Sequence, residues 1–278
     1  MARDTSFYYS FLVLPADKRR AIVAVWDFCR AVDDAVDEAP AEQSASEVQR
    51  WRDEVARCFD GGHAGDPAGR ALQPLIAGFD LPRSAFEALV EGVEMDLHGR
   101  RYRTFDELYE YCIRVASAVG LMCVRDLRLH RIRRRASTRS ICGVALQLTN
   151  ILRDVPGDLA RGRVLPADRR SRALRGDGNG SAGRDRARGG VRSPEGESAA
   201  RVRGRARAAI TRVRTQRCRA SDARRLVAAR IMGNIYRGIL DRIERAGYDV
   251  FTAVIRVPRP RRALIAATTW AKTLVTGR

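Results

Sequence analysis

The chain has 278 residues, of which 45% are hydrophobic, so it can bury a substantial core in one large domain or two small ones. No apolar stretch approaches the roughly 20 residues of a membrane span, and the N-terminal sequence lacks the pattern of a signal peptide. Six cysteines without paired spacing predict reduced, mostly buried thiols in a cytosolic protein.

The net charge of +19 lies in two segments of the chain. Residues 121–140 carry a net charge of +6 and residues 161–220 carry +13, so the rest of the chain is neutral. A nucleic-acid-binding domain would be expected to spread basic charge over one face. We therefore expect no nucleic-acid partner.

Hydrophobic spacing of three and four residues predicts helices throughout the chain. No alternating strand pattern or hairpin signal interrupts them, so the predicted fold class is all-α. Thr104 followed by Glu107 is the pattern of a capping box at the start of one helix. The helices are predicted at residues 16–38, 43–60, 84–98, 104–123, 141–155, 222–246 and 261–275, with a short helical region between Pro74 and Pro82.

The first helix carries two aspartates that continue its apolar stripe. Asp33 and Asp37 follow Ile22, Trp26 and Cys29 at helical spacing, which directs both carboxylates toward the core. An inward carboxylate is costly unless it is paired or bound to a metal. The alternative is a helix end with solvated acids, and this interpretation is preferred for the neighbouring Asp34 and Glu38. The inward pair predicts a metal site.

A second polar face occurs in the run ALQLTNILRDVPGD. Steps of three, four and four place Gln147, Asn150, Asp154 and Asp158 on one side of a helix. An ordinary amphipathic helix would give the same pattern. Because two such faces occur in one all-helical chain, oxygen ligation of Mg²⁺ is favoured, since this ion bridges carboxylates to substrate phosphates.

These motifs together resemble the squalene and phytoene synthase family. The resemblance rests on SFYYSFLVLP, FCRAVDDAVDE, YCIRVASAVGLMC and ALQLTNILRDV, and it covers residues 5–125, 143–168 and 226–275. The later run RIMGNIYRGILDRIERAGYDVF is similar to the branch that makes presqualene diphosphate. The resemblance implies a single α-helical domain over residues 1–278, built around a central cavity with the two aspartate motifs on opposite sides.

The resemblance also implies roles for individual residues. Asp33, Asp37, Asn150, Asp154 and Asp158 would hold Mg²⁺ against two diphosphates, and the four aspartates would be essential to catalysis. The expected substrate-binding residues are Ser6, Phe7, Arg30, Gln147, Asn150, Arg153 and Tyr236. Ser6 and Phe7 match a segment that closes over the substrate, the two arginines would contact phosphate oxygens, and Tyr236 would form a hydrogen bond nearby.

The chain departs from the family pattern in two arginine-rich segments, residues 126–141 and 165–219. Both lack apolar periodicity, and residues 163–209 taken alone read as a disordered basic linker. Of the basic residues, only Lys18 and Lys272 are lysines, which suggests a GC-rich gene. We interpret both segments as translated out of frame, with natural basic inserts as the alternative. Pro156 within the second motif is also unusual, and it is expected to displace Asp158.

The predicted function is Mg²⁺-dependent head-to-head condensation of two farnesyl diphosphates to presqualene diphosphate, in squalene or hopanoid biosynthesis. Phytoene or dehydrosqualene synthesis is the nearest alternative. From another class, an inactive homologue would use its basic segments to bind anionic lipid or nucleic acid, and the damaged segments leave the activity of this chain open. The expected location is the cytoplasm, with peripheral contact to the inner face of the membrane as an open question.

Overall fold

The computed structural model describes residues 7–40, 42–97, 102, 104–117, 136–160, 208 and 226–276. All regular structure in these ranges is helical, so the predicted all-α class is confirmed. The elements are α1 (Tyr8–Phe11), α2 (Ala16–Glu38), α3 (Ser44–Phe59), α4 (Pro67–Leu72), η1 (Gln73–Leu75), α5 (Ile76–Phe79), α6 (Arg83–Leu97), α7 (Phe105–Cys112), η2 (Ile113–Ser117), α9 (Ala136–Ala160), α13 (Val227–Arg245) and α14 (Arg259–Thr276).

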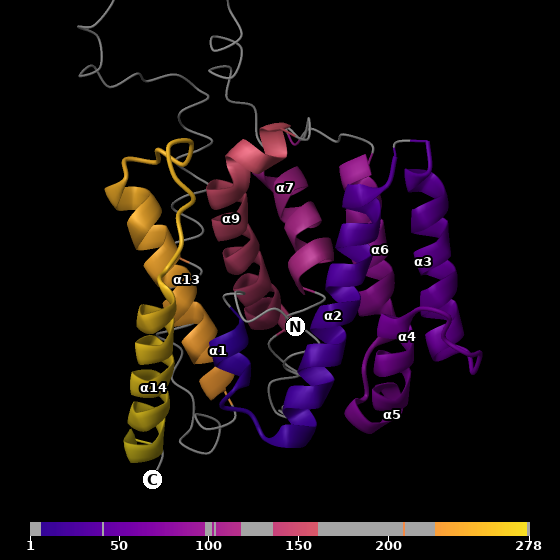
Figure 1. Ribbon diagram of the computed structural model, residues 1–278, viewed down its shortest axis with the longest axis horizontal. Coiled ribbons are helices and arrows are strands. Elements are labelled where there is room, and N and C mark those ends of the chain that lie inside the picture. The colour runs from indigo at the N-terminus through magenta and orange to yellow at the C-terminus, as the bar shows by residue number, and fades with distance from the viewer. Residues whose placement is uncertain are drawn as a thin grey trace, which may run out of the picture.

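The helices stand side by side with their axes roughly aligned, from α3 at one edge of the bundle to α14 at the other (Figure 1). In the half that contains α3, helices α2, α3, α4 and α6 pack on one another. In the other half α9, α13 and α14 pack in sequence. The short elements join the halves, because η2 contacts both α6 and α9, and α1 contacts α2, α13 and α14.

The predicted helix at 16–38 matches the bounds of α2, and the capping box at Thr104 is present at the start of α7. The helix predicted at 104–123 differs, because α7 ends at Cys112 and a π-helical turn follows over Ile113–Ser117. This turn lies close against α6, where a Cβ added to Gly92 would meet the Val115 side chain. Hydrophobic spacing over five residues does not distinguish an α-helical turn from a π-helical turn.

Helix α9 is longer than predicted at both ends. It begins at Ala136, so the last residues of the segment 126–141 are helical, and it continues through Pro156 to Ala160. Pro156 was expected to displace Asp158, but the helix continues through the proline and Asp158 remains within it. The rest of the segment 126–141, and the segment 165–219 except residue 208, lie outside the described residues.

The largest apolar core lies between α2, α3 and α6. Phe28 is fully buried at its centre, with edge-to-face contacts to Trp51 at 5.2 Å and to Phe86 at 5.4 Å between ring centroids. Offset and edge-to-face aromatic pairs add to the free energy gained from burial alone. Two of the cysteines that were expected to be buried thiols, Cys29 and Cys58, lie in this half as buried side chains.

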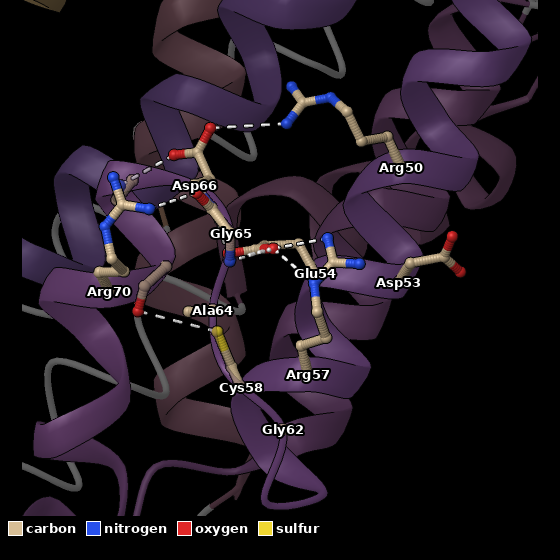
Figure 2. Close-up of polar contacts among 12 residues, drawn as sticks. Arg50, Asp53, Glu54, Arg57, Cys58, Gly62, Ala64, Gly65, Asp66 and Arg70 are labelled. Atoms are coloured by element: carbon tan, nitrogen blue, oxygen red, sulfur yellow. Dashed lines mark hydrogen bonds and ion pairs between the residues drawn. The ribbon is translucent and has the colours of Figure 1, made fainter.

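One carboxylate is enclosed in this half, at the corner between α3 and α4 (Figure 2). The side chain of Glu54 has no exposed surface. The backbone N–H groups of Gly65 and Asp66 donate to it at 3.0 and 2.8 Å, and Arg57 donates through Nε and Nη2 at 3.0 and 2.7 Å. Burial would raise the pKa of Glu54, but these hydrogen bonds outweigh it and hold the pKa below its usual value.

The α4 helix approaches Glu54 closely because residue 69 is a glycine. A Cβ at Gly69 would collide with Oε1 of Glu54. Asp66 caps α4, since its side chain accepts a hydrogen bond from the N–H of Ala68 at 2.8 Å, and it also faces Arg50. The corner is therefore fixed by one buried carboxylate whose hydrogen-bonding capacity is used.

Candidate active site

Helix α2 carries the first aspartate motif into the centre of the bundle. Both carboxylates were predicted to point toward the core. Asp33 is only partly accessible to solvent, but Asp37, one turn nearer the end of the helix, is exposed, so the prediction was wrong for Asp37. Burial, and then the nearby negative charge of Asp37, raise the pKa of Asp33 to about 7. Asp96 adds to this effect, while Arg30 opposes it. Carboxylates from α2 and α6 therefore cluster around Asp33.

Two residues near Asp33, Asp96 and Tyr111, were not identified from the sequence. Asp96 lies near the end of α6, and the hydroxyl of Tyr111 on α7 donates a hydrogen bond to its Oδ2 at 3.0 Å. Burial and the charge of Asp96 raise the pKa of Tyr111 well above its usual value, so the phenol stays protonated. The sequence did contain a signal for Asp96, because this residue continues the helical stripe of Leu89 and Val93, which are buried. An inward acid on an apolar face is the feature that identified Asp33.

The second motif lies on α9. Nδ2 of Asn150 donates to Oε1 of Gln147 at 3.3 Å, and Arg153 pairs with Asp154 through two contacts of 2.7 and 2.5 Å. Tyr236 reaches the same group from α13 and lies close to both Asn150 and Arg153. Burial raises the pKa of Tyr236, although Arg153 acts against this effect. The structure thus brings together four residues that were predicted as one site, and it places Tyr236 beside them.

The remaining predicted residues lie at different places. The ring of Phe7 packs on Trp26 at 4.2 Å and on Tyr236 at 5.7 Å between centroids, which connects the start of the described chain to α2 and α13. Arg30 pairs with Asp34 at 2.8 Å, and both side chains are largely exposed. Asp158 is partly buried in the last turns of α9, and Ser6 lies outside the described residues.

The oxygen atoms of the two motifs suit a hard divalent cation. Asn150 Oδ1 is buried and accepts no hydrogen bond, and Asp33 faces other carboxylates rather than donors. Both conditions are costly in the protein alone and are relieved by a cation. Within the part of the chain that the structure describes, no three carboxylate, histidine or cysteine side chains converge as a complete set of metal ligands. Carboxylate and amide oxygens are nevertheless the donors that suit Mg²⁺, an ion that keeps several waters and shares substrate phosphates as ligands.

The squalene/phytoene synthase family model matches residues 1–263 of the chain. Phytoene synthase 2 of Solanum lycopersicum is 34% identical over 97% of this chain and 87% of its own length. A 15-cis-phytoene synthase of Synechocystis is also 34% identical, over 97% of this chain and 82% of its own length. The presqualene diphosphate synthase of Rhodopseudomonas palustris is 41% identical, over 60% of each chain.

Solved structures agree with these sequence matches. A dehydrosqualene synthase in complex with a ligand superposes with a TM-score of 0.75, covers 98% of this chain and 93% of its own, and is 23% identical. A squalene synthase of Alicyclobacillus acidocaldarius gives a TM-score of 0.62 over 87% and 89% of the two chains, at 26% identity. The chain therefore belongs to the squalene/phytoene synthase family of isoprenoid-forming prenyltransferases.

Proposed function

We propose that the protein joins two farnesyl diphosphates head to head, with Mg²⁺, to give presqualene diphosphate. The observations that support this proposal are two polar groups, an acidic one around Asp33 on α2 and a mixed one around Asn150 and Arg153 on α9. The ring of Phe7 contacts Trp26 of α2 and also Tyr236, which lies beside the second group. The carboxylates around Asp33 can bind a metal ion that also binds a diphosphate, and the guanidinium of Arg153 can bind phosphate oxygens directly.

The reaction begins when the allylic C–O bond of one substrate breaks and its diphosphate departs. When bound, Mg²⁺ would neutralise the negative charge that develops on the leaving group, and Asp33, Asp37, Asn150, Asp154 and Asp158 are the residues that would hold it. Arg153 is enclosed beside Tyr236, so its charge interacts more strongly with a diphosphate than it would in water. Arg30 reaches phosphate oxygens if it exchanges its contact with Asp34.

The allylic cation that remains is attacked by the double bond of the second substrate, and loss of one proton closes a cyclopropane ring. The apolar and aromatic side chains, including Phe7 and Trp26, exclude the water that would otherwise quench the cation. A group must accept the released proton. Asp96 lies beside Asp33 and is oriented by Tyr111, so this pair is our candidate acceptor.

Phytoene synthesis from geranylgeranyl diphosphate is the second candidate. It is favoured by the relatives that match 97% of this chain, which are named phytoene synthases. The two reactions share the cyclopropyl step and differ in the length of the prenyl chain that the cavity accepts. The run RIMGNIYRGILDRIERAGYDVF, residues Arg230–Phe251, favours the presqualene branch, because it resembles the C-terminal helices of that branch.

A product assay separates the candidates. The full chain is incubated with Mg²⁺ and either farnesyl or geranylgeranyl diphosphate, with and without NADPH. We expect presqualene diphosphate from the shorter substrate, in equal amounts whether or not NADPH is present. Phytoene from the longer substrate alone would assign the second candidate. Squalene that appears only with NADPH would show that the reaction does not stop at the cyclopropane.

A further inference from the structure

The exposed large apolar side chains gather in one part of the described chain. With the exception of Leu12, all of them lie between residues 251 and 275. Four belong to α14, where Leu264 is 62% exposed, Trp270 46%, Leu274 39% and Val275 77%. Helix α14 forms an outer edge of the bundle and packs along α13 (Figure 1).

Helix α14 carries apolar side chains on its outer face as well as on its inner face. The face toward the bundle mixes both kinds, since Arg262, Thr269 and Thr273 are buried together with Ala266, and Ile265 packs on the core of α13. Thr269 Oγ1 accepts a hydrogen bond from Asn234 on α13 at 3.0 Å, so this polar contact is satisfied. The opposite face carries the exposed residues Leu264, Ala267, Ala271, Leu274 and Val275, at steps of three and four. A helix that faces water normally has its apolar stripe on the inside.

The charge around this helix indicates what covers the outer face. From Phe251 to Arg278 the chain has six basic residues and no Asp or Glu. Arg256 and Arg261 are exposed. A second copy of the chain would place like charges together, and the segment 161–220, with a net charge of +13, would be repelled in the same way. An anionic lipid surface matches both the charge and the apolar face.

We propose that the outer face of α14 lies in the headgroup region of an anionic bilayer, with Leu264, Leu274 and Val275 directed toward the acyl chains. The helix lies on the membrane, and none of the described helices has the length and hydrophobicity to cross one. Trp270 lies at the border of the apolar face, a position that aromatic side chains prefer at membrane interfaces. This surface does not depend on which prenyl diphosphate the active site accepts.

Vesicle binding tests the proposal with the full chain. The arginine-rich segments will attract anionic lipid through charge alone, so binding is measured at both low and high salt with vesicles of equal parts phosphatidylglycerol and phosphatidylcholine. Binding that remains at high salt reports apolar insertion. We expect Leu264→Ser combined with Leu274→Ser to weaken that binding by roughly tenfold or more, because each side chain contributes substantial apolar area. Leu12→Ser, the same change at the exposed residue outside the segment, should leave it unchanged.

Tryptophan fluorescence gives a second readout. Trp51 is buried and Trp26 partly buried, so Trp270 is the tryptophan positioned to meet lipid. Brominated acyl chains should quench its emission, and Trp270→Phe should remove most of the quenching while circular dichroism confirms an unchanged helix content. Three results would overturn the proposal: complete release at high salt, equal loss in Leu12→Ser, or lipid-free dimers that the double serine variant abolishes. The last result would assign the face to a second copy.

Discussion

Two carboxylates in the described part of the bundle, Glu54 and Asp33, have surroundings with opposite effects on their pKa. At the α3–α4 corner, Glu54 accepts hydrogen bonds from two backbone N–H groups and a guanidinium, and its pKa is lowered (Figure 2). On α2, Asp33 lies near Asp37 and Asp96, and its pKa is raised to about 7. Both residues are acids on helix faces that turn inward.

The difference between them separates a structural role from a functional one. A buried carboxylate with all its donors in place needs nothing from outside the protein, and it stabilises the fold in its charged form. A carboxylate that faces other acids leaves a net negative charge, which a cation or a proton must balance. The comparison predicts that removing Glu54 harms the fold and spares the chemistry, whereas removing Asp33 does the reverse.

The largest expected effect is on turnover in Asp33→Ala. Loss of one charged group at the point where leaving-group charge develops should lower kcat by roughly 100- to 1,000-fold. The free energy of unfolding should stay the same or rise, because a carboxylate is removed from a cluster of like charges. Glu38→Ala, at the exposed end of the same helix, serves as the control and should retain activity. Undiminished turnover in Asp33→Ala would contradict the proposed site.

Glu54→Ala should act on stability instead. Its loss leaves the N–H groups of Gly65 and Asp66 without their acceptor and Arg57 without its carboxylate partner, so urea denaturation should show a loss of roughly 2–5 kcal/mol. Asp53→Ala is the matched control, because Asp53 is an exposed neighbour on the same helix, and its effect should stay within about 0.5 kcal/mol. Equal losses in the two variants would mean that the corner is not held by Glu54.

A smaller effect is expected for Tyr111→Phe. This change removes the hydroxyl that orients Asp96 and keeps the ring in the apolar contact with Tyr102. The hydrogen bond to a charged acceptor contributes about 1.5–3 kcal/mol, so kcat should fall by at least about tenfold if Asp96 accepts the proton. KM should change little. A change in KM alone would indicate a substrate-binding role for this pair.

The smallest effect concerns acid stability. The pKa of Glu54 is lower in the folded protein than in the unfolded chain, so its contribution is complete above the unfolded value and is lost as pH falls through the folded value. Unfolding free energies measured in the acid range should therefore decline less steeply for Glu54→Gln than for the native chain. Glu47→Gln on the same helix provides the reference slope, and matching slopes for all three proteins would count against the assignment.

The sequence predicted the helices better than it predicted the site. Apolar spacing located α2 to the residue, and Thr104 marked the start of α7, because helix faces and caps are local properties. The Asp96–Tyr111 pair and the contacts of Tyr236 with α9 join residues on different helices. No spacing rule within one helix specifies such contacts. The burial of Glu54 could not be predicted either, because its backbone donors belong to a loop whose position the sequence pattern does not specify.

The aromatic contact of Phe7 has a practical consequence for handling the protein. Its ring lies between Trp26 and Tyr236, so residue 7 lies at the border of the candidate active site. A purification tag or fluorescent protein fused close to residue 7 would therefore bring bulk and charge near this site. The turn that follows α3, at Gly61 and Gly62, is the better position for a label, because α3 and α14 lie at opposite edges of the bundle.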